Sequence, residues 1–146
     1  AADGYVVGSY FQWGDSKVNA LGPGDPDLSY CFAVETQGSY LLEIHGRRDH
    51  DPGTFCETSA DDGCNDVFVQ IDGMGHGQQT WTKKMIKKPW GTWDWDGQWD
   101  PQNGSPFTTE IDLAPGAHEL GIAPRSHRVK IDAIRIYLKD TDPPSG

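Results

Sequence analysis

The chain has 146 residues, which is enough for one filled hydrophobic core and too few for two. Its formal net charge of -10 argues against a nucleic-acid partner, because nucleic-acid binding depends on neutralising phosphates with Lys and Arg, and it argues equally against an anionic membrane. No apolar run approaches the length that spans a bilayer, and 18 Gly and 10 Pro predict a soluble, turn-rich chain.

The chain is expected to be a piece of a longer secreted protein. No signal peptide is visible, and the sequence starts abruptly at Ala1 and ends in Asp-Pro-Pro-Ser-Gly, as an excised module would. We therefore assign residues 1–140 to one module and residues 141–146 to a linker remnant. The protein is expected to be extracellular and monomeric.

Short alternating stretches of apolar and polar residues, separated by Gly and Pro, predict many strands and no helix of useful length. In chain order, strands are expected over residues 5–13, 28–34, 39–47, 66–72, 107–113, 118–123 and 129–138. A turn at residues 114–117 should join the fifth and sixth of these into a hairpin. The last strand should place one set of residues on a common face: Ile131, Ala133, Arg135 and Tyr137. The coarse count is eight to ten strands, and the expected fold class is an all-β sandwich.

The three cysteines predict one disulfide. Cys56 and Cys64 bracket the polar loop ETSADDG, and a bridge between them would pin a segment that has no large apolar residues to hold it down. Cys31 lies in a strand-like stretch, where a reduced cysteine behaves as a small buried hydrophobe. A bridge from Cys31 to either of the others is the alternative that the sequence leaves open. The spacing of the three thiols does not match a zinc site.

The stretch Trp81–Trp99 holds five of the six tryptophans. They are too many and too irregularly spaced for one core face, so some of them should lie on the surface. Trp93 and Trp95 alternate with two aspartates, so an extended backbone would send both rings to one face and both carboxylates to the other. Exposed rings among polar side chains are typical of sugar recognition, because a pyranose stacks on a ring while its hydroxyls need donors and acceptors.

Tryptophans are also common in protein cores, and we expect Trp81 and at least one of Trp93 and Trp95 to be mainly structural. At least two of the five should contact ligand. A basic cluster immediately precedes them and consists of Lys83, Lys84, Lys87 and Lys88. This cluster would steer an acidic glycan to the rings. Alternatively, it is a solvent-facing strand or hairpin whose lysines discourage edge pairing, and we favour this second interpretation.

The order of the motifs is informative as a whole. The chain contains, in succession, GSYLLEIHGRR, NDVFVQIDG, W-x-W, LAPGAHELGIAPRS and KIDAIRIY. This order resembles that of the carbohydrate-binding modules of families 6 and 35, which have a galactose-binding-like β-sandwich, and the similarity extends from about Tyr5 to Leu138. It implies a jelly-roll β-sandwich of two antiparallel sheets, appended to a secreted polysaccharide-degrading enzyme, with a sugar site formed by loops at one end.

The resemblance also implies roles for single residues. Arg48 matches the Arg at a strand end, and Asn65 and Asp66 match the polar pair before the Phe-x-Val strand. Arg125 and Ser126 match an Arg-Glu pair after the Gly-x-His-x-Leu hairpin, with Ser in place of Glu. In that hairpin, His118 is expected to be structural. Together with the exposed rings, the predicted ligand-binding residues are Arg48, Asn65, Asp66, Trp90, Trp93, Trp95, Trp99 and Arg125.

A structural calcium ion is also implied by the resemblance, with Asp3 and Asp132 as candidate ligands. The opening Glu-x-Glu of the family is absent here, and the alternative role of Asp132 is to cap turn amides. An acidic loop offers a second candidate, because its oxygens suit Ca²⁺, although a solvated loop is the interpretation we favour. Its residues are Asp49, Asp51, Glu57, Asp61, Asp62, Asn65 and Asp66.

The leading function is therefore non-catalytic binding of a plant or algal cell-wall polysaccharide. The alternative is a small glycan-active enzyme, which would need two carboxylates at a defined separation, and its candidates are Asp94, Asp96 and Asp100. A third hypothesis is a structural or adhesive module without sugar affinity. The sequence leaves open whether the glycan is neutral or acidic.

Overall fold

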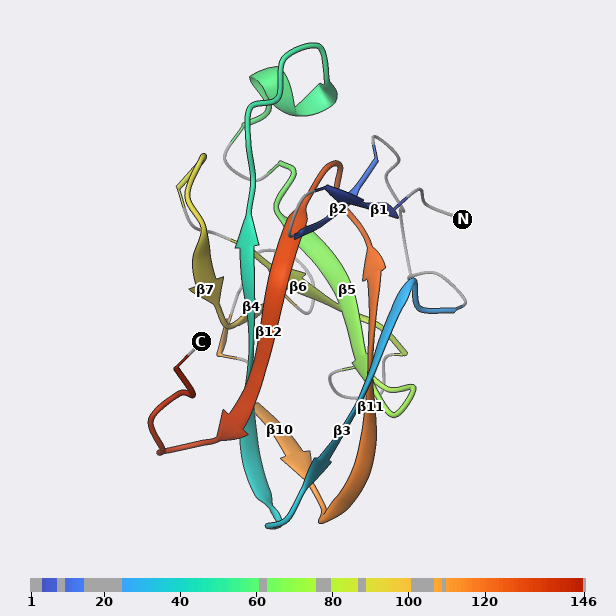
Figure 1. Ribbon diagram of the computed structural model, residues 1–146, viewed down its shortest axis with the longest axis vertical. Helices are drawn as coiled ribbons and strands as arrows, with labels where there is room; N and C mark the ends of the chain where they lie inside the picture. The colour runs from blue at the N-terminus through green and yellow to red at the C-terminus, as the bar shows by residue number, and fades with distance from the viewer. Residues whose placement is uncertain are drawn as a thin grey trace.

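The computed structural model describes residues 4–7, 10–14, 25–60, 63–75, 80–86, 89–100, 107–108 and 110–145. Within them, the chain forms two antiparallel sheets that pack face to face, and one short 3-10 helix lies beyond one end of the sandwich (Figure 1). The predicted all-β sandwich of two antiparallel sheets is confirmed.

The first sheet has the strand order β1 (Gly4–Val7), β2 (Tyr10–Trp13), β12 (Lys130–Leu138), β4 (Gly38–Arg47) and β10 (Glu110–Leu113), and β7 (Asp94–Asp96) also pairs with β4. The second sheet has the order β3 (Leu28–Val34), β11 (Gly116–Pro124), β5 (Asp66–Ile71), β6 (Thr82–Met85), β8 (Gln98–Asp100) and β9 (Phe107–Thr108). The 3-10 helix η1 covers Phe55–Thr58.

The core lies between the two sheets. On β4 the buried side chains alternate with half-buried ones, so Leu42 and Ile44 face the core while Glu43 and His45 face outward. All six residues of β5 are buried, because this strand lies in the middle of the second sheet between β11 and β6. Burying each large apolar side chain stabilises the fold by about 1.5–3 kcal/mol before the entropy cost is counted.

Two predicted strands are wrong in their continuity. The stretch 5–13 is divided into β1 and β2, which pair with each other. The stretch 107–113 is divided into β9 in the second sheet and β10 in the first, so the following turn joins the two sheets and makes no hairpin. Alternation along a chain is the same for a strand that stays in its sheet and for one that leaves it. The described residues therefore contain twelve strands, more than the expected eight to ten.

The last strand contains an irregularity that the sequence did not predict. The register of β12 against β4 shifts between Ile131 and Ala133, which moves Ile131 onto the core face. Ile134, Ile136 and Leu138 pack against the same core. The expectation that Ile131 shares a face with Arg135 and Tyr137 is thus wrong, and the shift leaves Asp132 exposed on the outer face.

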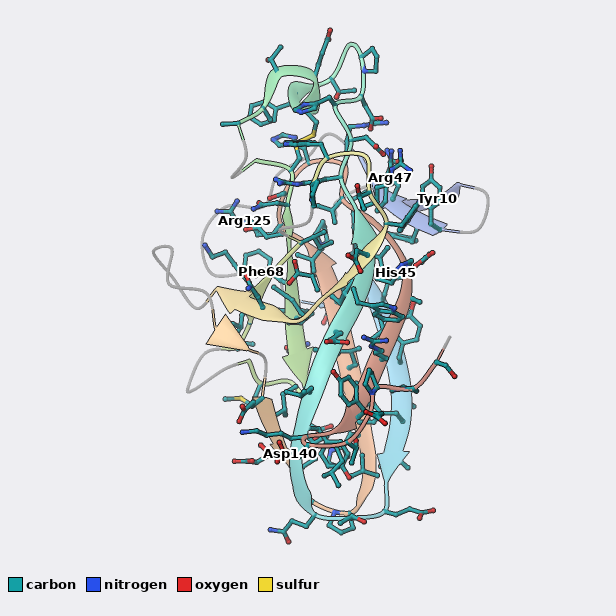
Figure 2. All side chains as sticks on the ribbon, turned by 90° about the vertical axis from the view of Figure 1, so that its left-hand side faces the viewer. Tyr10, His45, Arg47, Phe68, Arg125 and Asp140 are labelled. Atoms are coloured by element: carbon teal, nitrogen blue, oxygen red, sulfur yellow. A yellow bond between two sulfur atoms is a disulfide. The ribbon has the colours of Figure 1, made fainter. Side chains whose placement is uncertain are left out.

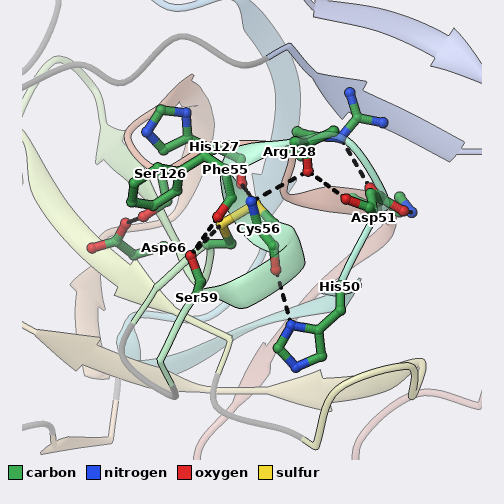
Figure 3. Close-up of a disulfide and its surroundings, with 12 residues drawn as sticks. His50, Asp51, Phe55, Cys56, Ser59, Asp66, Ser126, His127 and Arg128 are labelled. Atoms are coloured by element: carbon green, nitrogen blue, oxygen red, sulfur yellow. Dashed lines mark hydrogen bonds and ion pairs between the residues drawn. A yellow bond between two sulfur atoms is a disulfide. The ribbon is translucent and has the colours of Figure 1, made fainter.

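The predicted disulfide between Cys56 and Cys64 is confirmed. It closes the loop between β4 and β5, which carries η1 (Figure 3). Cys31 is free, as expected, but it is exposed and is not a buried hydrophobe. It alternates on β3 with Phe32, which packs against the core, so Cys31 faces outward from the edge strand of the second sheet.

Candidate ligand-binding site

A row of rings crosses the outer face of the first sheet. Its members come from β2, β4, β7, β12 and the residue before β7, and we call them the aromatic row: Tyr10, Trp93, His45, Trp95, Arg135 and Tyr137. Arg135 belongs to it because a planar guanidinium stacks on aromatic faces as a ring does. Figure 2 shows the side chains of Tyr10 and His45 over the β4 and β12 side of the sandwich.

Each ring of the row touches the next. The Tyr10 and Trp93 centroids lie 5.3 Å apart, and the His45 ring lies 5.6 Å from Trp93 and 4.9 Å from Trp95. The guanidinium carbon of Arg135 lies 4.1 Å from the Trp95 ring centre and 5.6 Å from that of Tyr137. Both tryptophan rings therefore project to the outer face, as the alternation along residues 93–96 predicts.

Acidic partners hold His45 and Arg135 in place. Nδ1 of His45 lies 2.6 Å from a carboxylate oxygen of Asp132, and Nε of Arg135 donates to Glu43. Burial and a hydrogen bond to Glu43 raise the pKa of the Tyr137 hydroxyl, so Tyr137 is a neutral group at pH 7. The protein itself thus holds two members of the row in fixed orientations.

A polar pocket of about 470 Å³ adjoins one end of the row. It is lined by Tyr10, Arg47, Asp49, His50, Asp51, Trp93 and Lys130. Lys130 Nζ lies 2.5 Å from Asp49 and 3.4 Å from Asp51, and Arg47 Nε lies 2.8 Å from Asp49. Burial alone would raise the pKa of Asp49, but hydrogen bonds and charge from Lys130 and Arg47 outweigh it and hold the pKa below its usual value.

A tight turn places Trp90 beside this pocket. Thr92 N donates to Pro89 O at 3.3 Å, and Gly91 has a φ of +75°, which the third position of a type II turn requires. Gly91 N also donates to Arg48 O at 2.9 Å, which ties the turn to the end of β4. The Trp90 ring stacks on His50 at 3.7 Å, and the Arg48 guanidinium lies 4.4 Å from its centre.

The other polar residues that the resemblance implies for ligand binding, together with Ser126, are called the end cluster: Arg48, Asn65, Asp66, Arg125 and Ser126. Arg48, Asn65 and Asp66 are only 5%, 3% and 5% exposed. Ser126 Oγ donates to Asp66, and an Arg125 guanidinium nitrogen lies 3.8 Å from the same carboxylate (Figure 3). The structure therefore places these polar groups mostly inside the loop end of the sandwich, with Arg125 partly exposed.

Trp81, another tryptophan of the predicted platform, does not belong to the aromatic row. Trp81 is buried and packs against Phe68 with ring centres 6.4 Å apart, so its expected structural role is confirmed. The side chains of Trp99 and Asp100 lie outside the described part of the chain, although their backbones form β8.

The favoured interpretation of the basic cluster is wrong for Lys84. This side chain is completely buried on β6, where burial lowers its pKa to about 7, against the opposing effect of the carboxylates of Asp96 and Glu43. Asp96 is buried as well, because it occupies the inward position of β7 beside Trp95. Lys83 is half-buried on the same strand, and Lys87 and Lys88 lie outside the described residues.

No group of three or more His, Cys, Asp or Glu side chains in the described residues is arranged to hold a metal ion. Asp132 is bonded to His45, and Asp3 lies outside the described part. In the acidic loop, Asp49 and Asp51 face cations, and Asn65 is buried. Asp61 and Asp62 are not described. Among the described residues, the candidate ligands are therefore not gathered around a common point, and calcium binding stays a prediction.

Sequence reasoning missed Tyr10, His45, Lys130, Arg135 and Tyr137 as members of a site. The alternation along β4 predicts which of its residues face outward. It does not predict that His45 pairs with Trp95 on one neighbouring strand and with Ala133 on the other. His118, expected to be structural, is bonded through Nδ1 to Asp72 and through Nε2 to the Ala114 carbonyl.

No protein-family model matches the chain, and no curated protein matches its sequence. Within the described residues, no helix is long and apolar enough to cross a bilayer.

Proposed function

We propose that this protein is a non-catalytic carbohydrate-binding module that attaches a secreted polysaccharide-degrading enzyme to a plant or algal cell-wall polysaccharide. The observation that carries the proposal is the juxtaposition of the aromatic row with the polar pocket. A sugar unit needs an apolar surface for its ring face and paired donors and acceptors for its hydroxyls. The row offers the first, and the pocket at its end offers the second.

The rigidity of the site supports the proposal. A shallow sugar site buries little area, so affinity depends on avoiding the cost of ordering side chains during binding. In this protein His45 and Arg135 are held by carboxylates, and Trp90 is held by a turn and by stacking on His50. The row is also built mainly on strands, which position side chains more precisely than loops do.

The ionisation state of the carboxylate of Asp49 in the pocket favours binding over catalysis. A glycosidase needs one carboxylic acid with a raised pKa in an apolar setting. The pocket carboxylate Asp49 has a lowered pKa and is engaged by two cations. Of the candidates named from the sequence, Asp94 accepts a hydrogen bond from the Trp95 backbone, and Asp96 is buried against Lys84.

The test is retention of the isolated chain by a panel of polysaccharides in affinity electrophoresis, for the native protein and for Trp95→Ala. We expect the substitution to weaken binding about tenfold or more, because it removes a stacking surface in the middle of the row. Phe55→Ala is the matched control, since Phe55 is 61% exposed and stacks on His127 away from the row. Circular dichroism checks that both variants are folded.

Three outcomes separate the hypotheses. Binding that is lost in Trp95→Ala and kept in Phe55→Ala supports the module. Release of reducing sugar on incubation with a polysaccharide would make the protein an enzyme. No retention by any glycan would leave the structural or adhesive hypothesis.

A further inference from the structure

The two cations that line the polar pocket are both paired with carboxylates. Its lining holds two cations, Arg47 and Lys130, and two carboxylates, Asp49 and Asp51. Arg47 Nε donates to both Asp49 oxygens, and Lys130 Nζ reaches both carboxylates. Arg128, which is not part of the lining, lies 2.9 Å from Asp51, so three cations share the two carboxylates. Each cation at the pocket thus already has a carboxylate partner within the protein.

The same pairing of cations with carboxylates holds along the aromatic row. Arg135 is paired with Glu43, and His45 is bonded to Asp132. The chain as a whole carries a net charge of -10, so the long-range field repels a polyanion.

The described members of the basic cluster do not add charge to the aromatic row. Its two described members, Lys83 and Lys84, lie on β6 in the second sheet, whereas the aromatic row covers the outer face of the first. Lys84 is moreover completely buried. The positions of Lys83 and Lys84 therefore do not support the hypothesis that lysines next to the tryptophans in sequence steer an acidic glycan to the rings.

We propose that the ligand of this site is an uncharged polysaccharide, an inference that rests on the proposed function. A uronate or sulfate entering the pocket would have to displace Asp49 or Asp51 from its cation and leave that carboxylate without its partner. A neutral hydroxyl needs no such displacement, because it both donates and accepts. A Lys–Asp or Arg–Asp pair presents a donor and an acceptor side by side, which suits two adjacent hydroxyls of one sugar unit.

The test compares one neutral polysaccharide that the protein retains with two derivatives of it, substituted to the same low degree. The carboxymethyl derivative adds charge, and the hydroxyethyl derivative adds similar bulk without charge. We expect the carboxymethyl derivative to bind about fivefold or more weakly than the hydroxyethyl derivative at low salt. The dissociation constant of the neutral parent should change less than about twofold between low and high salt.

A variant removes one of the two carboxylates directly. Asp51→Asn increases the surplus of cations at the pocket, so the discrimination against the carboxymethyl derivative should fall about threefold. Glu119→Gln is the matched control, because it makes the same change of charge at an exposed position of the second sheet. The salt dependence of the native protein gives an independent readout if Asp51→Asn fails to fold.

Tighter binding of the charged derivative, weakened by salt and abolished in Trp95→Ala, would overturn the neutral-ligand inference while leaving the proposed function intact. Retention of acidic glycans alone, with no neutral glycan of the panel bound, would overturn the neutral-ligand inference as well. Failure to retain any glycan of the panel would instead remove the proposed function itself.

Discussion

The aromatic row and the end cluster are built from similar residue types and have different surroundings. Both contain an arginine that stacks on a tryptophan ring, but the row lies on strands of the first sheet, whereas most of the end cluster lies at the ends of β5 and β11 in the second. The rings of the row are half-buried on an outer face, whereas Arg48, Asn65 and Asp66 are buried. A polar group whose partners are supplied by the protein stabilises the fold, and one that faces a pocket is available to a ligand.

The substitution Asp66→Ala tests most directly whether the end cluster stabilises the fold and does not bind the ligand. The substitution leaves Ser126 and Arg125 without their carboxylate partner at a buried position, so we expect a loss of about 3 kcal/mol in the free energy of unfolding. Urea unfolding measures the loss. Glycan affinity per folded molecule should be unchanged, and a variant of native stability that has lost its affinity would assign Asp66 to the ligand site.

The disulfide tests the same end of the sandwich. Replacing Cys56 and Cys64 by Ser together removes a bridge with a sequence separation of 8. Loop-closure entropy for a loop of this length predicts a loss of about 2.5 kcal/mol in the free energy of unfolding. Cys31→Ser is the control and should change the stability by less than about 0.5 kcal/mol, because Cys31 is exposed and free. An equal loss of stability in the double Cys56 and Cys64 variant and in Cys31→Ser would contradict the assignment of the disulfide to Cys56 and Cys64.

The buried Lys84 should make the free energy of unfolding depend on pH without affecting the aromatic row. Its pKa is lowered from 10.5 to about 7 by burial, so between these values the unfolded chain binds a proton that the folded chain does not. The free energy of unfolding should therefore rise with pH, by about 2 kcal/mol between pH 7 and pH 9. Thermal unfolding at several pH values measures this slope.

Lys84→Met should remove that slope, and Lys83→Met, on the neighbouring half-buried position, should keep it. Glycan affinity should not follow the stability curve, because Lys84 lies in the interior and not on the aromatic row. An unchanged slope in Lys84→Met would mean that another group titrates.

The smallest expected effect is that of Asp132→Asn on the row. An amide still accepts a hydrogen bond from His45 but carries no charge, so the ring of His45 is held less firmly. We expect affinity to fall about threefold and stability to change by less than about 0.5 kcal/mol, because Asp132 is exposed. Isothermal titration and urea unfolding measure the two quantities, and a larger loss of stability than of affinity would place Asp132 with the structural residues.

Much of the fold could be predicted from local pattern. The alternation of β4 and the apolar residues of β5 identified two central strands at nearly their observed bounds. The polar loop between Cys56 and Cys64 correctly indicated a bridge. The division of the stretches 5–13 and 107–113 into two strands each could not be predicted. A strand that changes its hydrogen-bonding partner keeps the same alternation of apolar and polar residues.

The candidate site was only half predictable. Trp93 and Trp95 stood out as rings on one face of an extended segment, but their neighbours come from β2, β4 and β12, which are far apart in sequence. The burial of Lys84 was hidden for the same reason, since a lysine reads as a surface residue until the fold places it against Asp96 and Glu43.

The sequence by itself determined the all-β class, the disulfide and the outward direction of the Trp93 and Trp95 rings, because alternation, loop composition and residue type act over a few neighbouring positions. Only the tertiary structure decided which polar residues are buried and which surround a pocket. That choice depends on strand order, on the shift of register in β12 and on the crossing of the chain between sheets, and these are set by the packing of the whole core.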